Sequence, residues 1–254
     1  MAQALLNGLR MDVSLYSAAA AMNATERWQD LIADNLSTAN IPGSRQREAS
    51  FSAVQAGVAA ANGERFVVPF AGSSINFSQG ELRATGNNMD FAVDGKGFIA
   101  IQLPDGSKAY TRDGEFKLNA QGQLVTKQGH PVAGESGPLQ FDPNNSAPIT
   151  VSADGEVSQG SEIKGKISLV EFARPQQLTL LGNGLFRNDV PDMLPLPAGE
   201  TKIRQGFIET ANTSPTLAMA SMITAMRMFE SNEKVMQMQN DRMGKTISDL
   251  SGAN

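Results

Sequence analysis

Residues 213–250 read TSPTLAMASMITAMRMFESNEKVMQMQNDRMGKTISDL, and this stretch decides the fold. Ser214 is a good helix N-cap, and Pro215 suits the first helical position, where a missing N–H costs nothing. Alternating steps of three and four residues then select nine positions, of which seven are apolar: Met222, Met226, Phe229, Glu233, Met236, Asn240, Met243, Ile247 and Leu250. So narrow an apolar stripe is typical of a coiled coil. We therefore expect a long C-terminal helix that needs a partner helix.

The N-terminal end of the chain predicts that partner. Residues 2–37 contain no proline and a single glycine, so a long helix is expected there. Asn40, Pro42 and Gly43 then end it. A second stripe runs through Leu9, Val13, Ser17, Ala20, Ala24, Trp28, Leu31 and Asn35. The two ends of the chain are thus expected to pair.

The middle of the chain follows a different pattern. From Phe66 to Phe186, short runs alternate apolar and polar residues with period two, which predicts β-strands. Turn signals separate the runs: Asp94-Gly95, Asp105-Gly106, Asp113-Gly114, Gln121-Gly122 and Asp154-Gly155. Such pairs favour hairpins because both residues tolerate positive φ. This region is expected to be an all-β barrel or sandwich.

These patterns predict an α+β fold. Long N- and C-terminal helices form a coiled coil, and the chain between them forms a central all-β domain, either a barrel or a sandwich. The expected parts are an N-terminal helix over 1–40, a connector over 41–65, a β domain over 66–205 and a C-terminal helix over 206–254 that pairs with 1–40. Within the connector, a short helix is expected near residues 51–60. Residues 188–199 hold three prolines and a glycine, which predicts an irregular return path.

Composition excludes several classes of protein. The net charge is −5 over 254 residues, so nothing points to nucleic acid or an anionic membrane. There are no cysteines, and one histidine and two tyrosines leave little material for acid–base catalysis. His130 is interpreted as a turn residue, and Asp90 and Asp94 as turn residues rather than metal ligands. Arg45 and Arg47 are interpreted as a small solvated basic spot. We expect no catalytic, cofactor or metal site and no small-molecule substrate.

Seven of the twelve methionines lie between Met219 and Met243. They are consistent with core packing inside one coiled coil. They are equally consistent with a stripe that packs against non-identical neighbours, which flexible thioether side chains permit. The residues alone leave both interpretations open.

Three motifs, in order, are shared with a known family. Residues 34–43, DNLSTANIPG, resemble the N-terminal signature of bacterial flagellar rod and hook proteins. Residues 205–212, QGFIETAN, with RMFE at 227–230, resemble the family's C-terminal signature. Between them, TG at 85–86, DFAV at 90–93, YTRDG at 110–114 and GQLV at 122–125 resemble its β-domain pattern. Ser44 and Ala211 depart from the usual aromatic residue and serine.

The resemblance implies a structural subunit of the flagellar basal-body rod. Its terminal helices would assemble with other rod subunits and copies of itself into a hollow shaft that transmits torque. It would leave the cell through the flagellar type III export apparatus without a cleavable signal peptide, and reside in the periplasm-spanning rod. The residues expected in assembly are Leu9, Val13, Ala20, Ala24, Trp28, Leu31, Asn35, Leu36, Asn40, Pro42, Gly43, Gly206, Glu209, Asn212, Met222, Met226, Phe229, Met236, Met243, Ile247 and Leu250.

Two alternatives remain at this point. Within the family, chain length and RMFE are most similar to proximal-rod members, with a distal-rod or hook-type subunit as the alternative. From another class, the β domain would be a ligand-binding module on a coiled-coil stalk. Clustered aromatic residues in a cleft would favour the module, but the single tryptophan, Trp28, falls in the N-terminal helix.

Overall fold

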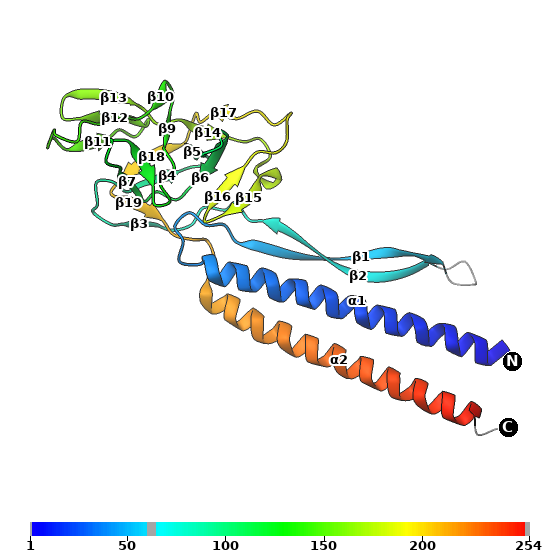
Figure 1. Ribbon diagram of the computed structural model, residues 1–254. Coiled ribbons are helices and arrows are strands. Elements are labelled where there is room, and N and C mark those ends of the chain that lie inside the picture. The colour runs from blue at the N-terminus through cyan, green and yellow to red at the C-terminus, as the bar shows by residue number, and fades with distance from the viewer. Residues whose placement is uncertain (1, 60–64, 252–254) are drawn as a thin grey trace. The chain divides into compact units, whose positions relative to one another are not determined.

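A computed structural model describes residues 2–59 and 65–251, including the side chains of 17–52 and 71–248. The chain forms two compact units (Figure 1). The helix unit comprises Met1–Leu36, Arg47–Ser74 and Pro215–Asn254, and the β unit comprises Ser37–Gln46 and Ile75–Ser214. The domain boundaries set out above stay a prediction.

A long helix lies at each end of the chain, as expected. Helix α1 spans Ala2–Thr38 and α2 spans Pro215–Ser251. Helix α2 begins at the proline that the sequence places at its first position. The two helices run side by side in the helix unit (Figure 1), where Ile32 packs with Ala218 and Ala225, and Trp28 and Met222 flank them. The small alanine side chains allow the helix backbones to approach closely.

The expected coiled coil between the two ends is wrong. The structure has one helix at each end and a mostly β chain between them, and the described helix–helix contact is a small cluster around Ile32 rather than a long continuous stripe. Met226 and Ile247, both expected in the stripe, are 52% and 67% exposed. Ala225, which packs on Ile32, directly precedes Met226, so Met226 points about 100° away from the contact with α1. The side chains of Leu9, Val13 and Leu250 lie outside the described residues.

The expected connector contains a strand, so the short helix expected near residues 51–60 is also wrong. Strands β1 (Arg47–Ala59) and β2 (Arg65–Ile75) pair in a two-stranded sheet. Asn35 fixes the start of β1, because its side chain accepts from the Arg47 N–H at 2.7 Å and donates to the Arg47 carbonyl at 2.8 Å. The ring of Phe51 meets Trp28 edge-on, with centroids 5.7 Å apart. These long-range contacts within the helix unit override the local helix signal.

The β unit is built from short strands and one 3₁₀ turn, η1. Their bounds are β3 Leu82–Ala84, β4 Phe91–Asp94, β5 Phe98–Gln102, β6 Lys108–Thr111, β7 Phe116–Leu118, β8 Leu124–Thr126, β9 Ala133–Gly134, β10 Gly137–Pro138, β11 Ile149–Val151, β12 Glu156–Gln159, β13 Glu162–Lys166, β14 Leu169–Glu171, η1 Pro175–Gln177, β15 Thr179–Gly182, β16 Leu185–Arg187, β17 Leu196–Pro197, β18 Lys202–Gln205 and β19 Phe207–Glu209. The largest sheet has six strands in the order β15-β16-β6-β5-β14-β17, and its pairs are antiparallel. The middle of the chain is thus mostly β-structure, in one six-stranded sheet and several smaller ones.

Strand β5 separates two cores. Successive side chains of a strand point to opposite faces. Ile99 therefore packs with Phe91 and Phe116 in a large aliphatic and aromatic core. Phe98 packs on the other side in an aromatic core with Tyr110, Phe172, Leu178, Phe186 and Met193. This two-sided burial explains the continuous apolar run of β5, since all four residues from Phe98 to Ile101 are buried.

Three of the five turn signals are hairpins. Asp105-Gly106 joins β5 to β6, Gln121-Gly122 joins β7 to β8, and Asp154-Gly155 joins β11 to β12, each as an antiparallel pair. Asp94-Gly95 instead lies between β4 and β5, and Asp113-Gly114 lies between β6 and β7. The two strands on either side of each turn do not pair with each other. At Gly114 the reason for glycine is close packing, because an added Cβ would lie 2.3 Å from the Phe91 carbonyl oxygen.

The segment over residues 188–199 is irregular except for the short strand β17, as expected. Within the described residues, no helix combines the length and hydropathy that a membrane span requires.

Candidate functional site

A buried charge cluster lies at the end of β19. Glu209 closes the pairing of β19 with β3 and is fully buried. Its carboxylate binds two guanidinium groups, Arg45 at 2.7 Å and Arg112 at 3.2 Å, and accepts the Gly80 N–H at 2.7 Å. We call Arg45, Arg112 and Glu209 the Glu209 cluster. It joins segments that are 164 and 97 residues apart in sequence.

The cluster holds two cations against one anion. Burial, and then the positive charge of Arg45, lower the pKa of Arg112 from 12.5 to about 10. Arg112 stays protonated at neutral pH, because Glu209 favours the charged form. Its other contacts are a donated hydrogen bond to the Gly95 carbonyl at 2.6 Å and the Phe98 ring, whose centroid lies 5.0 Å away. The side chain therefore links the cluster to the aromatic core.

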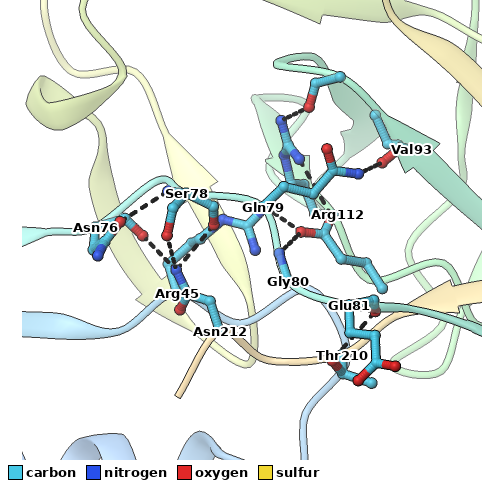
Figure 2. A network of polar contacts seen from close by, with 12 residues as sticks. Arg45, Asn76, Ser78, Gln79, Gly80, Glu81, Val93, Arg112, Thr210 and Asn212 are labelled. Carbon is cyan, nitrogen blue, oxygen red and sulfur yellow. Dashed lines mark hydrogen bonds and ion pairs between the residues drawn. The ribbon is translucent and has the colours of Figure 1, made fainter. Parts of the chain in front are cut away.

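Asn212 makes a second set of bonds beside the cluster. Its side-chain oxygen accepts the Gln46 N–H at 2.6 Å, and its amide donates to the carbonyls of Asn76 and Ser78 at 2.9 and 3.0 Å. Figure 2 shows Asn212 reaching toward both Asn76 and Ser78. A single asparagine thus replaces strand pairing among three chain segments, because its amide can both donate and accept.

Gly43 completes this region. Its φ is +68°, and its N–H donates to the Glu209 carbonyl at 2.7 Å. A Cβ at this position would lie 2.2 Å from the carbonyl carbon of Arg112. Only glycine allows both the left-handed conformation and this close backbone approach.

These contacts hold chain segments together, and they form no catalytic arrangement. The Glu209 carboxylate accepts from two arginines and a backbone amide, so it is engaged rather than poised as a base. Across residues 2–59 and 65–251, no group of three or more His, Cys, Asp or Glu side chains converges to hold a metal ion. Asp94 pairs with Arg204 at 2.8 Å, and Asp90 accepts from Asn87 at 3.0 Å.

Asp113 lies in the turn that follows β6 and is buried. Desolvation raises the pKa of its carboxyl from 3.8 to about 6. The Glu115 N–H, which donates to it at 3.0 Å, opposes the shift, and the charges of Glu115 and Asp90 add to it. This is a titratable group near neutral pH that the sequence analysis missed.

The exposed surface of α2 is rich in large apolar side chains. Those that are at least one-third exposed are Leu217, Met219, Ile223, Met226, Met228, Val235, Met238 and Ile247. At about 100° per residue, six of them lie beside the α1-facing alanines rather than among them, while Met238 lies between these six on the side away from the alanines and Ile247 lies in line with the alanines. Met219, Ile223 and Met226 follow one side, and Leu217, Met228 and Val235 follow the other. We call these two rows the apolar flanks of α2.

The residues expected in assembly divide into three groups. Gly43, Gly206, Glu209 and Asn212 lie in the β unit at or near the Glu209 cluster, where Gly206 has φ +79° and donates to the Asp90 carbonyl at 2.8 Å. Those that are buried or half-buried in the helix unit are Ala20, Ala24, Trp28, Leu31, Asn35, Leu36, Met222, Phe229, Met236 and Met243. Met226 and Ile247 are exposed, as is Asn40, while Pro42 is half-buried.

One interpretation of the sequence is wrong at this site. Arg45, expected in a solvated basic spot, is only 3% exposed and pairs with Glu209. The pairing of Arg112 with Glu209 was not predicted from the sequence. The available signal was Glu209 itself, a carboxylate directly after Phe207-Ile208, because a charge inside a buried strand requires a partner.

Two family models match this chain. The flagellar hook protein FlgE/F/G D1 domain matches residues 92–159, and the flagellar basal body rod FlgEFG protein C-terminal model matches residues 204–249. The second match begins in β18 and contains Glu209, Asn212 and the apolar flanks of α2.

Relatives match almost the whole chain. The flagellar basal-body rod protein FlgF of Mesorhizobium japonicum is 35% identical over 94% of this chain and 98% of its own. FlgF of Caulobacter vibrioides is 35% identical over 89% of this chain and 93% of its own. FlgG of Borreliella burgdorferi is 32% identical over 91% of this chain and 96% of its own, so a FlgG-like assignment is not favoured over a FlgF-like one. The chain therefore belongs to the flagellar basal-body rod protein family and is FlgF-like within it.

Proposed function

We propose that this chain, as a structural subunit of the flagellar rod, binds neighbouring rod subunits and further copies of itself through the apolar flanks of α2. Family membership supports the structural role, assembly within the basal body and a non-enzymatic function. The observation that carries the finer proposal is the exposed apolar surface of α2. Contiguous exposed apolar surface on a water-soluble chain marks an interaction site.

The flanks suit contacts with two neighbours at once. Each flank lies on a different side of the positions that pack on α1, so one α2 helix would contact a different neighbouring helix on each side. Methionines on both flanks add adaptable side chains, which fits contacts with subunits of differing sequence. Of the residues expected in assembly, Met226 would make such contacts directly.

The Glu209 cluster would serve assembly indirectly. Gly43, Glu209 and Asn212 hold the segments of the β unit that continue into α1, β1, β2 and α2. A subunit that bears load needs these segments fixed. In this proposal the rod transmits torque, and the subunit reaches it through the flagellar type III export apparatus.

The ligand-binding alternative has less support. It requires a coiled-coil stalk, which the structure contradicts. The aromatic side chains of the β unit pack with one another in its core rather than around an open cleft, as the ring pairs Phe98–Phe186 and Tyr110–Phe172 illustrate.

A charge placed on one flank tests the proposal. Ile223→Glu puts a carboxylate where we expect a dry contact, while glutamate favours the helix itself. Ser231→Glu is the matched control, because Ser231 is exposed on the same helix and the change adds the same charge. In a strain that lacks its own copy of the gene, we expect Ile223→Glu to abolish swimming and rod incorporation, and Ser231→Glu to retain both. Normal rods built from Ile223→Glu would contradict the proposal.

A further inference from the structure

Four methionines of α2 are exposed. Met219, Met226, Met228 and Met238 are 50–57% exposed. The other described methionines are more enclosed: Met193 is 3% exposed, Met89 packs against the main core, and Met22, Met222, Met236 and Met243 are half-buried. The structure therefore divides the described methionines into an exposed set on α2 and a less exposed set, part of which lies on another face of the same helix.

Accessible thioethers react with peroxides. The sulfur lone pair attacks one peroxide oxygen, the O–O bond breaks, and an S–O bond forms. The sulfur is oxidised by two electrons, and hydrogen peroxide is reduced to water, so the atoms and electrons balance. The product, methionine sulfoxide, is polar and chiral, and methionine sulfoxide reductases reverse the reaction.

The position of the four residues gives this chemistry a consequence. Met219 and Met226 lie on one apolar flank with Ile223, and Met228 lies on the other with Leu217 and Val235. A sulfoxide on either flank would have to lose its water when a neighbouring helix covers it, and burying an unpaired polar group is unfavourable. Oxidation would therefore weaken assembly while leaving the enclosed cores of the subunit intact.

We propose that Met219, Met226, Met228 and Met238 form a reversible oxidation site through which peroxide prevents the free subunit from assembling. This inference rests on the proposed function of the α2 flanks. It makes the unassembled subunit sensitive to oxidant and the assembled subunit resistant, because assembly covers the flank methionines. Repair by a reductase restores a subunit that is competent to assemble.

The test uses the full chain and hydrogen peroxide. Peptide mass spectrometry follows sulfoxide formation at each methionine with time. We expect the four exposed methionines to react at least several-fold faster than Met193. Association of the chain, alone and with neighbouring rod subunits, is measured by sedimentation before oxidation, after it and after treatment with methionine sulfoxide reductases. We expect about a tenfold weaker association after oxidation and its recovery after repair.

A variant in which all four methionines are leucine separates oxidation at this site from general damage. Leucine keeps the apolar character and helix propensity of these positions. The association of the variant after peroxide treatment is compared with its own association before treatment, and we expect no loss. Equal loss in the parent and the variant, or full association of a parent oxidised at all four positions, would overturn the inference.

The outcomes also separate this inference from the proposed function. If Ile223→Glu prevents association but oxidation does not, the flanks are contact surfaces and the oxidation site fails. If the untreated chain associates neither with itself nor with rod subunits, both ideas fail. Protection of Met219, Met226 and Met228 in assembled protein is a further expected result, and equal reactivity in both states would contradict it.

Discussion

The two units of this protein use their apolar residues in opposite ways. The β unit encloses large side chains, with Phe91, Phe98, Phe141 and Phe186 almost completely buried. The described cluster of the helix unit centres on Ile32 and two alanines, whereas the exposed flanks of α2 carry leucine, isoleucine, valine and methionine. The β unit thus keeps its hydrophobic surface for its own stability. The helix unit leaves several large apolar side chains of α2 exposed.

The same contrast holds between one ion pair of each unit. The side chains of Arg45 and Glu209 in the β unit are 0% exposed, whereas those of Arg47 and Asp34 in the helix unit are 32% and 59% exposed. A buried ion pair is weak evidence of net stabilisation, but its disruption leaves an uncompensated charge. An exposed pair is screened by water and salt. The same two residue types should therefore respond very differently to substitution.

The largest effect is expected from Glu209→Gln. Glutamine keeps the size of the side chain but removes the only carboxylate that binds Arg45 and Arg112 in the cluster. Two buried guanidinium groups then repel each other, so we expect a loss of about 3–5 kcal/mol in the free energy of unfolding. Urea unfolding measures it, with Glu81→Gln as the control, since Glu81 is exposed and directly precedes Leu82, the β3 partner of Glu209. A loss equal to that of the control would contradict the structural role of the cluster.

A smaller effect, which depends on pH, is expected from Asp113→Asn. The folded-state pKa of Asp113 is raised from 3.8 to about 6, so folding favours its protonated form. The stability that this protonation contributes is fully present below the unfolded pKa and is lost as the pH rises through about 6. Asparagine does not titrate and keeps an acceptor for the Glu115 N–H.

The variant should therefore gain on the parent as the pH rises from 4 to 8, by on the order of 2 kcal/mol in unfolding free energy. Unfolding of both chains in urea across this range gives the difference directly. A constant difference between parent and variant at every pH would show that Asp113 does not titrate differently in the folded protein.

The smallest effect is expected from Arg47→Gln in the helix unit. The substitution removes the 2.8 Å ion pair with Asp34, but it leaves the backbone of residue 47, which pairs with Asn35. We expect a change below about 1 kcal/mol that vanishes in high salt. Thermal unfolding at low and high salt measures it. A loss as large as that of Glu209→Gln would erase the contrast between the two units.

Sequence reasoning succeeded where the signals were local. Pro215 marks the first residue of α2, and Asp105-Gly106 forms a hairpin, because a fixed φ and a tolerance for positive φ act within a few residues. It failed where distant residues decide the outcome. Residues 51–59 form a strand that is fixed at its start by Asn35 and contacted by Trp28, neither of which a local pattern reveals.

The errors at the site have the same origin. Arg45 looked solvated because its neighbours in sequence are polar, yet its partner lies 164 residues further along the chain. Met226 fits a regular apolar spacing, but Ala218 and Ala225 occupy the face that packs on α1. Apolar spacing identifies which residues prefer a contact. It does not determine whether the contact lies inside the same chain.

The chain crosses between its two units at four places, after residues 36, 46, 74 and 214. On the β-unit side, these crossings lead into segments tied together by Gly43, Gln46, Asn76, Glu209 and Asn212. In mechanical terms, the crossings are four covalent tethers, that is, four chain connections that can each carry load. All four end in the hydrogen-bonded region formed by these residues, which acts as a single anchor. A pull on any single tether is shared with the others before a strand of the β unit can peel away. The unit would yield as a block, at a force set by the anchor rather than by its weakest strand.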